Sequence, residues 1–138
     1  PSLGWPRLAG AAAALVLVGA AIGFGVDRAT RDETSSRVVA AATTLPGTSA
    51  RLHVSDGAGS TLRVEGLPVL GGGRVYEVWI QHDGMVRPAG ALFGVHSDGT
   101  GAAAIPRKLA PGDRVMVTRE RAGGAAQPSE TPIIVARA

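Results

Sequence analysis

The sequence contains no cysteine among its 138 residues. This absence excludes disulfide bonds, iron–sulfur clusters, blue-copper sites and a cysteine nucleophile, so an exported domain would have to be stable through burial alone. Aromatic residues are also scarce, with two Trp, one Tyr and two Phe. Tyr76 and Trp79 nevertheless lie three residues apart in one strand-like segment. That pair is either part of a ligand site or part of a fold core.

Clustered charge is missing as well. The net charge of +3 comes from thirteen Arg and one Lys against eleven carboxylates, and the Arg residues are scattered singly. A nucleic-acid-binding protein normally carries a basic stripe with interleaved aromatics. We therefore expect no direct contact with nucleic acid, and the high isoelectric point reflects the permanent charge of arginine.

Motifs for catalysis and metal binding are absent. No Gly-x-Ser-x-Gly elbow occurs, and His53, His82 and His96 lack the helical spacing or cysteine companions of zinc sites. The segment Gly71–Arg74 resembles a phosphate loop, but it precedes a strand and has no Lys-Ser/Thr pair. We predict no catalytic residue, no metal and no cofactor, with the histidines as solvated neighbours of turns.

One long apolar run stands out against this background. Leu8–Val26 contains nineteen uncharged residues, and as a helix it would span roughly 28 Å, close to the thickness of a bilayer core. Arg7 and Asp27 close the run, and Trp5 lies where an interfacial aromatic would. The alternative is a secretory signal peptide, whose apolar core has only about 7–15 residues and is followed by a small-residue cleavage site. We predict a transmembrane helix.

The remaining chain divides at a proline. Residues 27–48 are polar and Ala-rich, and we expect the helix to continue into this juxtamembrane helix or linker until Leu45, Pro46 and Gly47 end it. Residues 49–138 then form one small domain. Because the chain starts at Pro1 rather than Met, we expect residues 1–7 to be the end of a truncated cytosolic segment.

The domain reads as short strands separated by turns, three of which contain Asp-Gly pairs that favour tight hairpins. The sequence predicts an all-β, Greek-key-like antiparallel β-sandwich of about seven strands, preceded by one N-terminal transmembrane α-helix. The expected strands are Ala50–Ser55, Thr61–Glu65, Arg74–His82, Ala89–His96, Gly101–Ile105, Arg114–Arg119 and Pro132–Ala136.

A period of two places Tyr76, with Val78 and Ile80, on one face of its strand and Trp79 on the other. Bulky residues on both faces suit a central strand. We expect the Gly- and Pro-rich connection at residues 122–132 to fold over the Trp79 ring. In the alternative interpretation, Trp79 is a platform for a ligand.

Two segments, "GLPVLGGGRVYEVWIQHDGMVRPAGALF" and "GDRVMVTRERAGGAAQPSETPI", resemble the extracytoplasmic domain of the anti-sigma-K factor family of bacterial membrane regulators. The likeness extends from about Leu8 onward. It departs from the family pattern at Arg121, Ala125 and Ser129, where proline, serine and threonine are usual. The residues that match the pattern are Leu67, Pro68, Gly73, Tyr76, Trp79, Gly84, Gly90, Phe93, Val117, Thr118, Glu120, Gly123, Gly124 and Pro128.

The resemblance implies a single-pass protein of the cell membrane. Its cytosolic N-terminal domain would bind an extracytoplasmic-function sigma factor, and the β-rich domain outside would act as sensor or restraint. It also implies two cleavages, first by an outer site-1 type protease and then by an intramembrane site-2 type protease. Arg28, Arg31 and Arg37 follow the apolar run while only Arg7 precedes it, so charge alone favours the opposite orientation. The extracytoplasmic placement rests on the resemblance.

Glycines interrupt the predicted membrane helix. Gly19, Gly23 and Gly25 would lower its helix propensity by up to about 1 kcal/mol each, which would help it to unwind for cleavage. Glycine is also common in membrane helices generally. The Gly19–Gly23 spacing could instead bring two helices close together.

Two other functions remain open at this stage. The first is a cell-envelope receptor domain in which Trp79, Glu77 and Gln81 hold a small ligand or peptide. The second is an envelope hydrolase that uses His82 or His96 with a nearby carboxylate.

Overall fold

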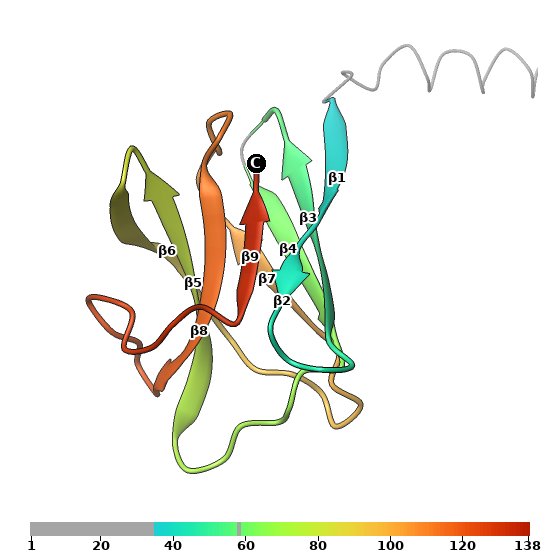
Figure 1. The fold of residues 1–138 in the computed structure, drawn as a ribbon, viewed down its shortest axis with the longest axis vertical. Coiled ribbons are helices and arrows are strands. Elements are labelled where there is room, and N and C mark those ends of the chain that lie inside the picture. The colour runs from blue at the N-terminus through green and yellow to red at the C-terminus, as the bar shows by residue number, and fades with distance from the viewer. Residues whose placement is uncertain (1–34, 58) are drawn as a thin grey trace, which may run out of the picture. The chain divides into compact units, whose positions relative to one another are not determined.

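A computed structural model describes residues 35–57 and 59–138. These residues form two antiparallel sheets that face each other as a sandwich (Figure 1). The four-stranded sheet has the order β1-β3-β4-β7 and the five-stranded sheet has the order β2-β9-β8-β5-β6. The strands are β1 Ser36–Ala40, β2 Ala42–Thr43, β3 Ser49–Ser55, β4 Ser60–Glu65, β5 Arg74–His82, β6 Met85–Phe93, β7 Gly101–Ile105, β8 Arg114–Arg121 and β9 Ile134–Arg137. The predicted all-β class and antiparallel sheets are confirmed.

All seven predicted strands are present, and β5 and β7 have the predicted bounds. The helix or linker expected through residue 48 is wrong for residues 36–43, which form β1 and β2. The chain passes from one sheet to the other between these strands, where the Ala41 N–H donates to the Ala50 carbonyl. Four of the five β1 residues are exposed, so no alternation of apolar and polar residues marked the strand. Pairing with β3 and β9 holds β1 and β2 in place.

The core lies between the two sheets, where alternate residues of each strand point inward. Leu52, Leu62 and Ile105 come from the four-stranded sheet, and Val78 and Val117 come from the five-stranded sheet; all are fully buried. Such alternation is what makes a two-layer sandwich bury its apolar side chains.

Tyr76 belongs to this core, as predicted. Its ring stacks on Phe93 with the centroids 5.3 Å apart, and its hydroxyl donates a hydrogen bond to the Pro68 carbonyl at 2.5 Å. The hydroxyl thereby fixes the connection between β4 and β5, and the buried oxygen has a partner.

Only one Asp-Gly pair forms the predicted two-residue hairpin. Asp83 and Gly84 have φ values of 47° and 79°, and both positions of the tight turn between β5 and β6 therefore need left-handed backbone. Asp56-Gly57 lies in a longer loop between β3 and β4. Asp98-Gly99 lies in the connection from β6 to β7, which joins the two sheets.

Strand β6 is displaced from the predicted Ala89–His96 and contains an irregularity. Val78 pairs with Ala91 while Trp79 pairs with Pro88, so Ala89 and Gly90 are extra residues on β6. Gly90 has a φ of 81°, as is common where a bulge bends a strand. Pro88 also lies on this strand, and β6 is an edge strand, where proline is tolerated.

Several connections meet at one end of the sandwich, which we call the Ser36 end. Ser36 pairs with Ser55 there, and the connection 106–113 crosses from the end of β7 to the start of β8. The β5–β6 turn and the C-terminus lie at the same end (Figure 1), where the Ala138 N–H donates to the Asp113 carbonyl. The first described residues therefore lie at the same end as the turn and connection 106–113.

No helix within residues 35–57 and 59–138 is long and apolar enough to cross a bilayer. The predicted helix Leu8–Val26, with Gly19, Gly23 and Gly25, lies outside the described residues.

Candidate functional site

A chain of polar side chains lies buried on the outer face of the five-stranded sheet. Trp79 has no exposed surface, and its indole N–H donates to the Thr118 hydroxyl at 2.8 Å. The Thr118 hydroxyl in turn donates to Glu120 Oε1 at 2.6 Å. Thr118 and Glu120 share one face of β8 because they are two residues apart. The indole and the hydroxyl therefore both have partners in a buried setting.

Residues 122–132 are fastened to the five-stranded sheet through backbone and side-chain hydrogen bonds. The Ser129 N–H donates to Glu120 Oε1 at 2.9 Å, and the Ala125 N–H donates to Glu77 Oε2 at 2.8 Å. Glu130 accepts two hydrogen bonds from the Arg119 guanidinium, each at 3.0 Å. We call Trp79, Thr118, Glu120, Glu77 and this loop the carboxylate network.

The glycines of the loop have different surroundings. Both Gly123 and Gly124 have positive φ, at 94° and 82°. A Cβ on Gly124 would lie 3.1 Å from Leu92 Cδ2 and 3.2 Å from the Glu77 carboxylate, whereas a Cβ on Gly123 would meet nothing within 4 Å. Gly124 is thus needed for space as well as for backbone conformation.

Glu77 and Glu120 are the two buried carboxyl groups of the network, and their pKa values shift in opposite directions. Burial raises the pKa of Glu77, the Ala125 N–H only partly offsets this, and the nearby charge of Glu120 raises it further. Burial also raises the pKa of Glu120, but hydrogen bonds from Ser129 and Thr118 outweigh it and leave the pKa below its ordinary value. The difference follows from the number of donors that each carboxylate accepts from.

The residues of the family pattern occupy structural positions. Tyr76 and Phe93 lie in the core, and Gly84 and Gly90 lie in the hairpin turn and the bulge. The loop carries Gly123, Gly124 and the half-buried Pro128. Trp79, Thr118 and Glu120 form the hydrogen-bond chain described above.

The alternative ligand platform is wrong for this structure. Trp79 and Glu77 are buried, Glu77 is bonded to Ala125, and Gln81 Oε1 accepts a hydrogen bond from Arg114. No face of the indole is left for a ligand to contact.

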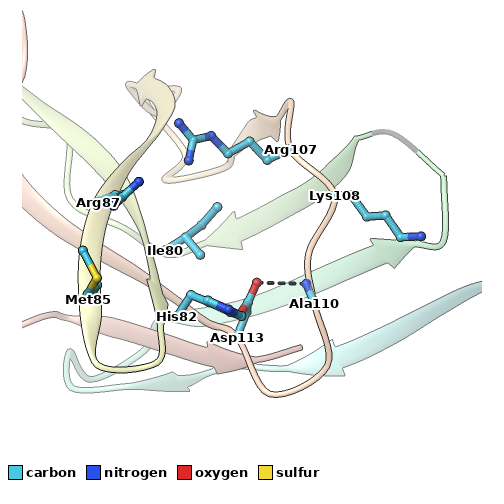
Figure 2. Close-up of a pocket in the computed structure, with 8 residues that line it drawn as sticks. All are labelled: Ile80, His82, Met85, Arg87, Arg107, Lys108, Ala110 and Asp113. Atoms are coloured by element: carbon cyan, nitrogen blue, oxygen red, sulfur yellow. Dashed lines mark hydrogen bonds and ion pairs between the residues drawn. The ribbon is translucent and has the colours of Figure 1, made fainter.

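A cleft of about 360 Å³ opens at the Ser36 end. It lies between the β5–β6 hairpin and the connection 106–113. Arg87 and Arg107 start from these two elements and reach toward each other, whereas the Lys108 side chain extends away from them (Figure 2). The residues that line it are Ile80, His82, Met85, Arg87, Arg107, Lys108, Ala110 and Asp113. We call it the cationic cleft.

His82 and Asp113 form an ion pair at the edge of this cleft. His82 Nδ1 lies 2.5 Å from Asp113 Oδ1, and Asp113 Oδ2 accepts a hydrogen bond from the Ala110 N–H at 2.9 Å. The hydrogen bond with Asp113, assisted by the charge of Asp83, raises the pKa of His82 above its usual value. The sequence carried no signal for this pair, because 31 residues separate its members.

The alternative hydrolase requires His82 or His96 beside a carboxylate, and the structure places His82 beside Asp113. No serine, threonine or cysteine is among the lining residues of the cleft, so His82 has no nucleophile beside it in the described part of the chain. His96 lies in the connection between β6 and β7. Within residues 35–57 and 59–138, no three His, Cys, Asp or Glu side chains are grouped to hold a metal ion.

Comparison with known proteins identifies the family. A search of curated proteins and a search of solved structures each found no match. A family model described as "Anti-sigma-K factor rskA, C-terminal" matches residues 8–133. Because this match covers most of the sequence, the chain belongs to the anti-sigma-K factor family, with the match lying in the C-terminal part of that family.

Proposed function

We propose that the protein is a membrane-anchored anti-sigma factor whose β-sandwich lies outside the cytosol. In this role it holds an extracytoplasmic-function sigma factor inactive on the cytosolic side, and its regulation proceeds by proteolysis. The observation that carries the proposal is the family match over residues 8–133, because it joins the apolar run to the β-domain. The role is regulatory and not catalytic.

The anchor is assigned to Leu8–Val26. Nineteen residues without a charge form a segment long enough for a bilayer core, and the match begins at its first residue. The sandwich follows after a short tether, since β1 starts at Ser36. This arrangement supports a single-pass protein with residues 35–138 on the side opposite to the sigma factor.

The carboxylate network supports a role as a restraint. It fastens residues 122–132 to the sheet through hydrogen bonds to two buried carboxylates, which would make this loop harder for a protease to bind in an extended form. Proteases generally cut exposed, locally unfolded chain. A stable domain next to a membrane helix would therefore delay the first cleavage until a signal alters it.

Single cysteines can test the orientation, because the chain has none of its own. Ser97, which is exposed in the connection between β6 and β7, is replaced in the variant Ser97→Cys. A maleimide that does not cross membranes should label this variant in intact cells, and should label Ser2→Cys only after lysis. The reverse pattern would reject the extracytoplasmic placement.

The sigma-factor role is tested by isolating the full-length protein from membranes of its own host with mild detergent. A sigma factor should copurify and should be released when the protein is cleaved. If no sigma factor is recovered while the protein remains intact and folded, the proposed function fails even where the orientation is correct.

Intramembrane cleavage can be tested at the glycines. Substituting Gly19, Gly23 and Gly25 together by Leu should slow the second cut and leave the first unchanged, because leucine stabilises the helix that must unwind. Matched control substitutions Ala20→Leu, Ala21→Leu and Ala13→Leu add bulk to the same span at positions that already favour helix. Equal slowing by both sets would show that side-chain bulk, and not helix propensity, controls the cut.

A further inference from the structure

We propose that the cationic cleft docks the domain onto a membrane surface by binding the phosphate groups of anionic phospholipids. The proposal rests on the membrane anchoring proposed above, and it adds a second, reversible contact between the sandwich and the bilayer. Docking would hold the Ser36 end against the headgroups and shield the tether.

The first support is unpaired positive charge. Arg87, Arg107 and Lys108 line one cleft, and none of them forms an ion pair with a carboxylate within residues 35–57 and 59–138. The side chains come from β6 and from the connection 106–113, so the fold brings together cations that are remote in sequence. Arginine guanidinium groups offer forked donors that match phosphate oxygens.

The acidic groups nearby are already engaged. Asp113 is buried, and both of its oxygens have partners in His82 and in the Ala110 N–H. Asp83 Oδ2 lies 3.4 Å from His82 Nε2. The carboxylates near the cleft therefore act on His82, and the cations have no partner in the described chain to displace before they bind an anion.

The cleft also carries apolar surface suited to a lipid. Ile80 lines the interior, and Met85 at the hairpin tip is 57% exposed. An apolar side chain beside cations matches the boundary between headgroups and acyl chains. A free inorganic phosphate would gain nothing from these two side chains, and for this reason we assign the phosphate to a lipid.

The position of the cleft relative to the tether is the third support. Nine residues lead from Val26 to Ser35, and a fully extended chain of that length reaches only about 30 Å. Ser35 and Ser36 lie at the same end of the sandwich as the connection 106–113 and the β5–β6 turn (Figure 1). With Leu8–Val26 in a bilayer, the Ser36 end would be the end that stays within reach of the headgroups.

The test uses the full chain inserted in vesicles, with one spin label on an introduced cysteine. Asp56→Cys reports on the Ser36 end without lying in the cleft, and Ser97→Cys reports on the connection between β6 and β7. Relaxation of each label by nickel-chelating lipid headgroups measures its proximity to the membrane surface. Vesicles of phosphatidylcholine alone are compared with vesicles that also contain phosphatidylglycerol.

Phosphatidylglycerol should increase relaxation at position 56 much more than at position 97. Replacing Arg87, Arg107 and Lys108 by Gln should abolish the increase, because each cation near an anionic surface strengthens binding about five-fold. The matched control set is Arg51→Gln, Arg63→Gln and Arg121→Gln, which removes the same charge from exposed positions outside the cleft. The control variant should retain most of the increase in relaxation at position 56. The domain should also dock when it carries the charge-preserving substitutions Arg87→Lys, Arg107→Lys and Lys108→Arg.

Two results would overturn the proposal. One is equal relaxation at position 56 with and without phosphatidylglycerol. The other is that the cleft set and the control set reduce the phosphatidylglycerol-dependent increase equally. Inorganic phosphate, compared with chloride at matched ionic strength, should not release the domain selectively; selective release would assign the site to a free anion and reject the lipid. Failure of the chain to float with phosphatidylcholine vesicles would instead contradict the proposed anchor.

Discussion

The carboxylate network and the cationic cleft belong to the same small sandwich, but they differ in whether their charged side chains have partners. In the network, Glu77 and Glu120 are buried and accept hydrogen bonds from named donors. In the cleft, Arg87, Arg107 and Lys108 line an open space without a carboxylate partner in the described part of the chain. Buried polar groups must be satisfied for the fold to persist. Because the cleft cations have no carboxylate partner among residues 35–57 and 59–138, we expect them to contribute little to the folding of this part of the chain.

The largest expected effect tests the structural side of this comparison. Trp79→Ala removes a fully buried indole and should lower the free energy of unfolding by about 3–5 kcal/mol. Urea unfolding of the chain in vesicles, followed by pulse proteolysis, measures the change. Arg107→Gln in the same assay should shift it by no more than about 0.5 kcal/mol, as expected for a surface substitution. A small effect of Trp79→Ala would mean that the network does not hold the loop.

The next effect separates the two buried carboxylates. Glu120→Gln should destabilise the domain by about 1–3 kcal/mol, because Glu120 accepts from both Ser129 and Thr118 and the amide is a weaker acceptor. Residues 122–132 should become sensitive to limited proteolysis. Glu65→Gln, at an exposed position, is the matched control and should change neither property.

Glu77→Gln should behave differently at neutral pH. Its carboxyl pKa is raised in the fold, so the folded state binds the proton more tightly than the unfolded state does. The fold therefore loses stability as pH rises from the unfolded pKa of this carboxyl through its folded pKa. Glu120, with a lowered pKa, stabilises the fold above its unfolded pKa and loses this contribution as pH falls through the folded pKa.

Neutralising Glu77 should therefore cost little at pH 7 or add stability, and Glu77→Gln should flatten the pH dependence contributed by this carboxyl. Unfolding measured from acid to neutral pH for both variants checks the signs. Equal destabilisation by Glu77→Gln and Glu120→Gln at pH 7 would contradict the opposite shifts.

A smaller difference is expected between two neighbouring glycines of the loop. Alanine at either Gly123 or Gly124 must adopt a positive φ, which costs about 1–2 kcal/mol. Gly124→Ala should cost more, because its Cβ would crowd Leu92 and Glu77 while the Cβ at Gly123 meets open space. Unfolding of the two variants side by side measures the excess, and a larger cost at Gly123 would show that the loop has a different conformation.

Much of the fold was predictable because it depends on local patterns. The alternation in β5 placed Tyr76 and Trp79 on opposite faces, and both are buried there. Asp83-Gly84 identified its hairpin because the turn needs positive φ at both residues. Strand β1 was missed because its exposed residues show no alternation, and it forms only by pairing with β3.

The two candidate sites likewise differ in how far they could be predicted from the sequence. The family pattern pointed to Trp79, Thr118 and Glu120, and the loop was expected to cover the indole, although the hydrogen bonds that fasten it were not foreseen. The cleft was missed because its members come from β5, β6 and the connection 106–113. No spacing in the sequence links His82 to Asp113. The antiparallel pairing of β5 with β8, in which Gln81 lies opposite Arg114, brings them together.

The smallest expected effect concerns His82, which faces Asp83 of the adjoining turn and Asp113 beside it at the edge of the cleft. The cations Arg87, Arg107 and Lys108 line the same cleft. Asp113→Asn should lower the pKa of His82 more than Asp83→Asn does, because the hydrogen bond with Asp113 is the largest cause of its raised value. Histidine ring resonances followed by NMR through a pH titration measure both shifts.

Because the folded pKa is raised above the unfolded value of about 6.5, the pair stabilises the fold fully below that value, and the contribution is lost as pH rises through the folded pKa. Protonation of His82 also adds a positive charge to the cleft. Binding to phosphatidylglycerol should therefore strengthen slightly as pH falls through the same range in the native chain, and less so in Asp113→Asn. An unchanged titration of His82 in Asp113→Asn would show that the ion pair does not form.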